Sequence, residues 1–520
     1  MENLRVCLVG FLLTATATTA TAGGILTNTN QSIDFLRNPA RDAAIGLDGV
    51  YSNPAGVVFL PEGFHLGLNW QYAHQTRTIT STDPVFALGR KNNGTTKVFE
   101  GVADAPVIPS IQAAWNKGNW SLQFNFSIPS GGGKCEFENG LGSFERKVGE
   151  IASSFQSIDN MAYLLNQAAG SAIPVHGVTG YDMDSYMEGR QYYYGIQLGT
   201  AYKVNDNLSV YGGLRLLYGS ATYKARISNI KVVTTANGPE EFSSYLPKVG
   251  PQVTQIVPTA TAIVNTMNAA QEAGATLTEA QLQQKALLES GIASLTQMQA
   301  GQVLESLEKY NEGVNLLCNQ TGLGFAPIVG IDYKFGNFNF AAKYEFKTQI
   351  RMKNESTVFK ASEIEAVNKF KDEEEVNEDS PALLTLGAQW SPIEEIRLNA
   401  GWHHYFDKRA SWYNNAQKLL DHDSNEFLFG AEWDLSNKIT ISAGGQLTRY
   451  GLTDQYMNDM SFVVNSYSYG FGFNYKVRDN VKLKFAYFQT DYDDYDRTTP
   501  TTDSFTRTNK VLGVGCDIDL

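Results

Sequence analysis

The sequence has no uninterrupted apolar stretch near the roughly 20 residues that a membrane-spanning helix needs. It is also poor in cysteine: beyond residue 22 there are only Cys135, Cys318 and Cys516, too few for a disulfide scaffold. It lacks an excess of basic residues, and its formal net charge of −13 argues against nucleic acid as a partner. The chain is therefore either a secreted soluble protein or one that crosses a membrane as a closed sheet.

The first 22 residues have the features of a signal peptide. Arg5 precedes the apolar run 6–13, and small residues follow up to Ala22. This order of charge, short apolar core and small residues predicts cleavage before Gly23. A membrane anchor is excluded because the apolar run is too short to span a bilayer.

Apolar and polar residues alternate in many segments downstream. In 64–72 every second residue is apolar, and the same holds in 120–128, 338–346 and 512–520. A period of two predicts strands with one apolar and one polar face. The predicted strands are 64–75, 106–116, 119–129, 190–204, 207–225, 322–335, 338–350, 380–391, 395–408, 425–435, 438–449, 462–477, 480–491 and 508–520.

The connections between these strands alternate between short and long. The short ones carry turn residues, as in Gly336-Asn337, whereas the long ones cover about 76–105, 130–189, 227–321 and 349–380. Six aromatic residues lie just before short turns, on the apolar parity of their strands: Trp115, Tyr202, Tyr333, Trp390, Trp433 and Tyr475. Aromatic rings favour the headgroup level of a membrane. The sequence thus predicts an all-β fold, an antiparallel transmembrane β-barrel of roughly fourteen strands over 64–520.

The long loops contain helical signals. Thr278 with Gln281 and Ser294 with Gln297 match capping boxes. Apolar residues recur at helical spacing in two places: Ile151, Phe155, Ile158 and Leu165, and Val303, Leu307, Tyr310 and Val314. One interpretation is that these helices pack over the barrel mouth. Another is that they form an apolar groove that captures a ligand, and the same helices could do both.

Residues 23–63 precede the first strand and are too apolar for a solvated tail. Because such a segment must be buried, the barrel lumen is the available place, and we expect it to act as a plug. The run 48–56, which includes Asn53-Pro54-Ala55, resembles the hatch motif of the FadL/TodX family of outer-membrane transporters. We call residues 23–63 the hatch.

The resemblance implies a fourteen-stranded barrel with a hatch in its lumen, in the outer membrane of a Gram-negative bacterium. It implies passive transport of hydrophobic compounds such as long-chain fatty acids or aromatic hydrocarbons. In that family the third strand is kinked and opens a lateral exit. Pro129, Gly131, Gly132 and Gly133 end the third predicted strand here, so they are candidates for such a kink, although an ordinary strand-to-loop exit would look the same.

Two further sets of residues are candidates for a role. Arg215, Lys343 and Lys347 share the lumenal parity and would suit an acidic ligand headgroup, or they pair with lumenal acids such as Glu345. Cys135 and Cys318 both lie toward the long loops and form a candidate disulfide.

Other functions find less support. An enzyme, for example a lipid-modifying barrel, would need a nucleophile beside a histidine, and of the adjacent His403 and His404 only His403 lies on the polar, lumenal parity. No zinc spacing or phosphate loop occurs, so we expect no catalysis, cofactor or metal. A porin or adhesin would leave the hatch unexplained. We expect a monomer whose partners are outer-membrane lipid and a hydrophobic ligand.

Overall fold

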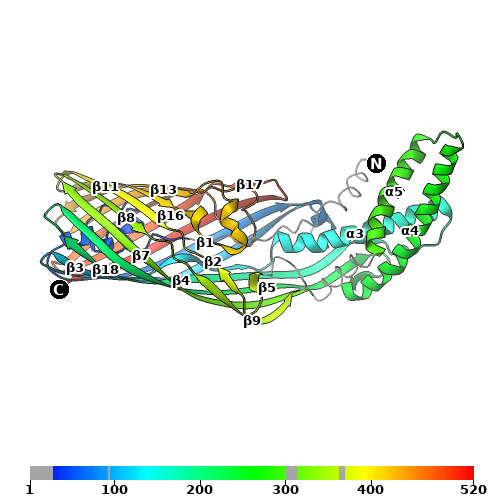
Figure 1. Ribbon diagram of the computed structural model, residues 1–520. Helices are drawn as coiled ribbons and strands as arrows, with labels where there is room; N and C mark the ends of the chain where they lie inside the picture. Colours follow the sequence, from blue (N-terminus) through cyan, green and yellow to red (C-terminus); the bar gives the residue numbers. More distant parts are fainter. Residues whose placement is uncertain (1–26, 92–93, 300–312, 362–368) are drawn as a thin grey trace.

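The computed structural model describes residues 27–91, 94–299, 313–361 and 369–520 (Figure 1). The predicted signal peptide lies outside these residues. No described helix is both long and apolar enough to cross a membrane.

Fourteen antiparallel strands form a closed, tilted barrel, as predicted. They are β1 (Gly63–Thr82), β2 (Thr96–Lys117), β3 (Trp120–Phe137), β4 (Val178–Lys203), β5 (Leu208–Thr234), β7 (Val314–Phe335), β8 (Phe338–Glu345), β11 (Leu383–Ile393), β12 (Ile396–Tyr405), β13 (Ser424–Ser436), β14 (Ile439–Arg449), β15 (Ser466–Arg478), β16 (Val481–Tyr492) and β18 (Thr502–Asp519). The barrel closes where β1 pairs with β18, from His65 opposite Asp519 to Thr82 opposite Thr502. Closure leaves no free sheet edge, which is what a membrane-spanning sheet requires.

Four further strands extend the sheet at the long-loop end: β6 (Gly238–Glu241), β9 (Arg351–Ala361), β10 (Glu375–Asn377) and β17 (Tyr495–Arg497). Short 3₁₀ turns lie in the loops of the same end: η3 (Pro84–Leu88), η5 (Asp407–Arg409) and η6 (Tyr413–Leu419).

The wall has an apolar outer face and a polar inner face. Along β15, Tyr467, Tyr469, Phe471 and Phe473 are exposed on the outside, while Ser466 and Ser468 are buried inside. Five of the six predicted belt residues, Trp115, Tyr333, Trp390, Trp433 and Tyr475, are 40–50% exposed near the short turns, whereas Tyr202 is half-buried. This arrangement is what a barrel surrounded by lipid needs.

The short turns are placed as predicted, whereas the strands reach further toward the long loops. Gly118 and Gly336 adopt positive φ of 57° and 56° in two of the tight turns, a conformation that glycine accepts without steric cost. At the other end, β1 continues to Thr82, and β7 begins at Val314 instead of 322. The predicted loops 76–105, 130–189, 227–321 and 349–380 are therefore partly strand. Beyond the lipid the outward residues need not be apolar, so the alternation fades while the ladder continues.

Three helices cover the long-loop end: α3 (Gly142–Ala169), α4 (Phe242–Glu272) and α5 (Glu279–Gln299) (Figure 1). The predicted stripe Ile151, Phe155, Ile158 and Leu165 lies on α3 and is buried. The Phe155 ring centroid is 5.7 Å from that of Phe242 and 5.1 Å from that of Tyr245. This stripe therefore packs against α4 and offers no open apolar groove.

One of the two capping boxes is confirmed. Gln281 N donates to Thr278 Oγ1 at 3.3 Å, and Thr278 N donates to Gln281 Oε1 at 2.9 Å. At 294 no helix begins, because α5 continues through that position. Of the second stripe, Val303, Leu307 and Tyr310 lie outside the described residues, and Val314 begins β7.

The described part of the hatch lies inside the barrel. It contains α2 (Ile33–Arg37) and the 3₁₀ turns η1 (Leu47–Val50) and η2 (Gly56–Phe59), drawn in blue toward the short-turn end in Figure 1. Ile33, Leu36, Val50 and Val57 are fully buried. The apolar residues of 27–62 are thus removed from water by the wall.

The predicted disulfide between Cys135 and Cys318 is wrong. Both thiols are free and buried. In the sheet, Cys135 is opposite Gly189, Gly189 is opposite Tyr223, and Tyr223 is opposite Cys318. Three strand spacings place the two Cα atoms about 14 Å apart, whereas a disulfide needs less than about 7 Å.

We expect three alkylatable thiols in the chain without residues 1–22, denatured in the absence of reductant. In the folded barrel, Cys135 and Cys318 should react slowly because they are buried. Intact-mass measurement after alkylation counts the thiols. One labelled thiol before reduction and three after it would indicate a disulfide between Cys135 and Cys318, and would contradict the strand register that separates them.

Candidate functional site

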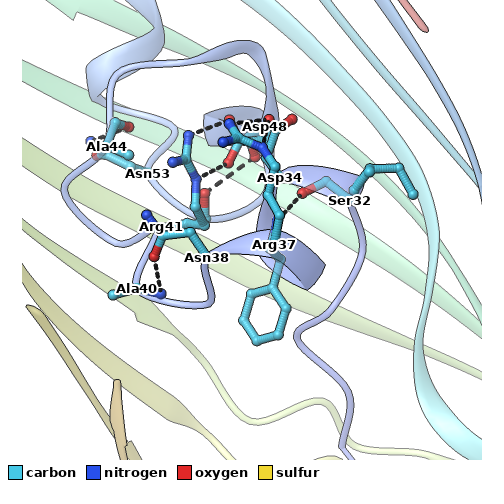
Figure 2. Close-up of polar contacts among 12 residues, drawn as sticks. Ser32, Asp34, Arg37, Asn38, Ala40, Arg41, Ala44, Asp48 and Asn53 are labelled. Atoms are coloured by element: carbon cyan, nitrogen blue, oxygen red, sulfur yellow. Dashed lines mark hydrogen bonds and ion pairs between the residues drawn. The ribbon is translucent and has the colours of Figure 1, made fainter. Parts of the chain in front are cut away.

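The hatch is held to the wall by buried ion pairs that begin at α2. Within the hatch, Ser32 Oγ accepts from Phe35 N at 3.1 Å, and Arg37 Nη2 lies 2.8 Å from Asp34 Oδ1 (Figure 2). Lys484 of β16 is completely buried, and its Nζ lies 2.7 Å from Asp34 Oδ2 and 2.6 Å from Asp517 Oδ1 of β18. One wall lysine therefore joins the hatch helix to a neighbouring strand.

A second group of ion pairs is centred on Glu432 of β13. Its Oε1 lies 2.8 Å from Arg37 Nη2 and 3.0 Å from Arg41 Nη1. Arg41 Nε is in turn 2.8 Å from Asp48 Oδ2, a contact within the hatch that Figure 2 shows. Buried charges are stable only when paired, so hatch and wall each supply the counter-ions of the other.

The motif Asn53-Pro54-Ala55 contacts three different strands. Asn53 Nδ2 donates to Asp332 Oδ2 of β7 at 2.6 Å and to Ala44 O at 3.4 Å. The carbonyl of Pro54 accepts from Gln123 of β3 at 2.8 Å, and that of Ala55 accepts from Ser209 of β5 at 2.7 Å. The side chain of Asn53 thus has its acidic partner on β7.

The hydrogen-bond ladder between β2 and β3 is interrupted, and we call this unpaired stretch the gap. Paired residues jump from Val102 opposite Glu136 to Ile111 opposite Phe126, so the intervening residues of the two strands form no ladder. Pro106, Pro109 and Pro129 fall within the unpaired stretches. Proline has no amide hydrogen to donate, which accounts for part of the missing ladder.

Strand β3 bulges beside this gap. Against β4, six steps along β3 from Ser127 to Gly133 correspond to four steps along β4 from Gly195 to Gln191. Gly131 and Gly133 adopt φ of +113° and +72°, which side chains with Cβ rarely accept. The structure thus places Pro129, Gly131, Gly132 and Gly133 together at one irregular point of the wall.

The first described residues of the hatch run along this part of β3. Thr27 forms a bridge with Ser130, and Asn28 N donates to Pro129 O at 2.8 Å. Ile128 N donates to Gln31 Oε1 at 3.0 Å. Part of the hydrogen bonding that β3 does not share with β2 is therefore supplied by residues 27–31.

Cavities lie on both sides of residues 27–29. A cavity of about 180 Å³, open to solvent, is bounded by residues of the hatch, β1, the β3 bulge and β13–β18. Its apolar lining comprises Phe35, Ala73, Ile108, Ile128, Phe488 and Val511. A smaller cavity of about 30 Å³ lies toward Arg215, Glu345 and Tyr405. The larger cavity includes Gly131, Gly132 and Gly133 and so reaches the wall gap.

The three cations proposed for a ligand headgroup all have carboxylate partners. Arg215 Nη1 lies 2.5 Å from Glu345 Oε2, and Lys343 Nζ lies 2.7 Å from Glu345 Oε1. Lys347 Nζ lies 3.1 Å from Asp379 Oδ2. Arg215 and Lys343 therefore pair with the lumenal acid Glu345, which was the alternative to binding a ligand headgroup.

His403 is occupied in a similar way. Its Nε2 lies 2.9 Å from Asp42 Oδ1 of the hatch, and its Nδ1 lies 2.8 Å from Glu426 Oε2. A catalytic histidine needs one ring nitrogen facing a nucleophile. Both nitrogens of His403 face carboxylates, so the residue holds the hatch in place.

Comparisons with known proteins agree with this geometry. No family model and no curated protein matches the sequence. A solved Pseudomonas aeruginosa FadL homologue is 10% identical, with a TM-score of 0.57 over 95% of this chain and 99% of that one. The chain has the FadL/TodX fold.

Two further structures with the FadL/TodX fold are similar over most of their length. A TodX mutant, described as a monoaromatic hydrocarbon channel, is 13% identical with a TM-score of 0.53, over 94% of this chain and 99% of that one. The P. putida toluene transporter TodX is 12% identical with a TM-score of 0.50, over 91% and 94%. The resemblance seen at 48–56 is thus confirmed at the level of the fold.

The residues that fix the hatch within the FadL/TodX fold were not singled out from the sequence. Lys484 and Glu432 lie within predicted strands, on the parity opposite to the apolar residues Phe485 and Trp433. That parity identifies them as lumenal charges. It does not reveal that their partners are Asp34, Arg37 and Arg41, because ion pairs between distant segments leave no periodic pattern.

Replacing Lys484 with Met should loosen the hatch. The change leaves Asp34 and Asp517 buried without their shared cation, which costs about 3–5 kcal/mol. We expect the small-ion conductance of the purified barrel in planar bilayers to rise. Lys482→Met on the same strand and parity, where the side chain is exposed, is the matched control. Equal conductance of both variants and the unmodified protein would show that Lys484 does not secure the hatch.

Proposed function

We propose that this protein transports hydrophobic small molecules across the outer membrane of a Gram-negative bacterium by passive diffusion. The observation that carries the proposal is the gap between β2 and β3, which adjoins the larger of the two cavities. In the proposed path a ligand enters from the long-loop end, occupies the cavity and leaves sideways through the gap into the membrane. Toluene, aromatic hydrocarbons and long-chain fatty acids are candidate ligands.

The hatch makes a sideways path more favourable than an axial one. Residues 27–62 fill the lumen toward the short turns and are bound by Lys484, Glu432, Asp332 and His403. An apolar molecule gains nothing by entering the water beyond the hatch, whereas the lipid next to the wall solvates it. The gap leads from Ile108 and Ile128 of the cavity lining to that lipid.

Only a small part of the hatch needs to move in this path. Residues 27–31 cover the β3 bulge through a few hydrogen bonds, such as Asn28 N to Pro129 O. Residues 34–48 are held by the buried ion pairs and would stay in place. A local shift of 27–31 therefore uncovers the gap while the axial route remains closed.

The other functions considered are less well supported. An open porin would need a free axial channel, which the hatch occupies. A lipid-modifying enzyme would need a histidine with a free nitrogen, and His403 offers none. We also propose that the protein is a monomer and that the exposed aromatic residues of its wall contact outer-membrane lipid.

Filling the gap should stop transport. Gly132 lines the cavity between the two glycines with positive φ, so a bulky side chain there enters the proposed exit. We expect Gly132→Trp to reduce uptake of labelled toluene by cells expressing the protein at least tenfold, because the indole would occupy the proposed lateral exit and block passage of the ligand.

The matched control is Gly212→Trp on β5. A Cβ at Gly212 meets no atom within 4 Å and faces outward, so the indole enters lipid. Surface amounts of both variants are compared by immunodetection on whole cells. Uptake by the Gly132→Trp variant equal to that of the control would contradict the lateral route.

A further inference from the structure

The outer face of β4 changes from apolar to charged at the long-loop end of the wall. Every second residue from Tyr202 to Tyr192 faces outward, and Leu198 and Ile196 between them are 56% and 41% exposed. The ten steps from Tyr202 to Tyr192 cover about 33 Å at the rise of a strand. At a strand tilt of about 40° this length matches the roughly 25 Å apolar band of outer-membrane barrels. Arg190, the next outward residue, therefore lies just beyond the part of the wall that faces lipid chains.

Aromatic residues mark this boundary on the neighbouring strands as well. Tyr194 is opposite Tyr218 of β5, which is 44% exposed, and Tyr218 is opposite Leu323 of β7. The ring centroids of Tyr192 and Tyr194 are 6.2 Å apart on the outer face of β4. Because aromatic rings favour the headgroup level of a membrane, the side chains directly above these rings meet lipid headgroups.

Two cations lie next to each other at this height. Lys134 of β3 and Arg190 of β4 are opposite each other in the ladder and share its outer face. Arg190 is exposed, and its Nη2 donates to Thr222 Oγ1 of β5 at 3.1 Å. No carboxylate oxygen in the described ranges lies within 4.0 Å of Arg190. Like charges directly opposite each other destabilise a sheet, so this pair favours the binding of an anion.

The acidic residues nearby already have other partners. Glu136 Oε2 lies 2.9 Å from Lys134 Nζ, and Glu188 Oε1 lies 3.2 Å from Lys224 Nζ of β5. The Tyr186 hydroxyl is within 2.8 Å of both carboxylates. Three cations thus face two carboxylates, and the positive charge that remains is that of the exposed guanidinium group on β4.

We propose that Arg190 and Lys134 bind the phosphate group of an anionic lipid in the surrounding leaflet, with its acyl chains along Tyr192 and Tyr194. A guanidinium group binds phosphate through two parallel hydrogen bonds, and the lysine adds a point charge. Clusters of basic residues beside a membrane attract anionic headgroups. The inference rests on the membrane location proposed above and goes beyond transport, because it concerns the outer face of the wall.

The bound lipid would lie beside the irregular part of β3. The pair of Lys134 with Arg190 directly follows the pair of Gly133 with Gln191, where the bulge ends. Beyond this point β4 and β5 continue toward the helices of the long-loop end (Figure 1). A lipid whose headgroup is held here has its acyl chains next to the β3 bulge, on the side of the wall that faces the membrane.

Lipid binding to the purified full-length barrel in an uncharged detergent tests this assignment. The probes are phosphatidic acid and phosphatidylcholine with the same acyl chains, which differ in the charge of the headgroup, and native mass spectrometry counts the bound lipid. The variant is Lys134→Gln with Arg190→Gln. Its control, Lys438→Gln with Lys510→Gln, removes two exposed cations elsewhere on the barrel. We expect phosphatidic acid to bind the variant at least tenfold more weakly than the control, with phosphatidylcholine affinity unchanged.

A single substitution separates lipid binding from a loss of stability. Arg190→Gln alone keeps the contact between Lys134 and Glu136, so we expect it to unfold at the same temperature as Lys510→Gln. Lys510 is an outward cation just beyond Leu512 on β18, where it is opposite His74, and it is therefore a matched control. Phosphatidic acid should bind Arg190→Gln at least threefold more weakly than this control.

Equal affinity of Arg190→Gln and Lys510→Gln for phosphatidic acid would overturn the proposed site. Inorganic phosphate at the concentration of the lipid should leave phosphatidic acid bound, because the acyl chains add their own contacts with the wall. Displacement by inorganic phosphate would instead identify a site for a free anion and overturn the assignment to a lipid.

Discussion

The pairing of buried charges between hatch and wall is the constraint on which the rest of the structure depends. Lys484 joins Asp34 to Asp517, and Glu432 receives both Arg37 and Arg41. Separated, each partner would be an uncompensated charge in a confined space, which is strongly unfavourable. The hatch and the barrel therefore stabilise each other, and the lumen toward the short turns stays filled. Any path for a ligand has to avoid this region.

In the transport route proposed here, the path lies where the ladder between β2 and β3 is interrupted. Prolines in β2 and β3 remove amide donors, and the β3 bulge with Gly131 and Gly133 prevents regular pairing. Residues 27–31 supply substitute hydrogen bonds at that point. Strong ionic contacts thus fix one part of the hatch, while weaker neutral contacts cover the gap. This difference in strength is what would allow the exit to open without release of the whole hatch.

Much of the fold, and less of the site, could be predicted from the sequence. Strands and tight turns were predictable because alternation and residues such as Gly118 and Gly336 act locally. Lys484 and Asp34 are 450 residues apart, and no local pattern relates them. The disulfide prediction failed because strand order, rather than loop position, sets the distance between Cys135 and Cys318.

The most direct test of the account is the conductance of a barrel without its hatch. A chain lacking residues 23–60 retains every strand of the barrel, so we expect it to fold. Water entering the lumen would then solvate Lys484, Glu432 and Asp332. Single-channel recording in planar bilayers should show a large, steady small-ion conductance for this chain and almost none for the unmodified protein. Equally low conductance of the two, with circular dichroism showing an intact barrel, would contradict the claim that the hatch closes the lumen and directs ligands to the wall.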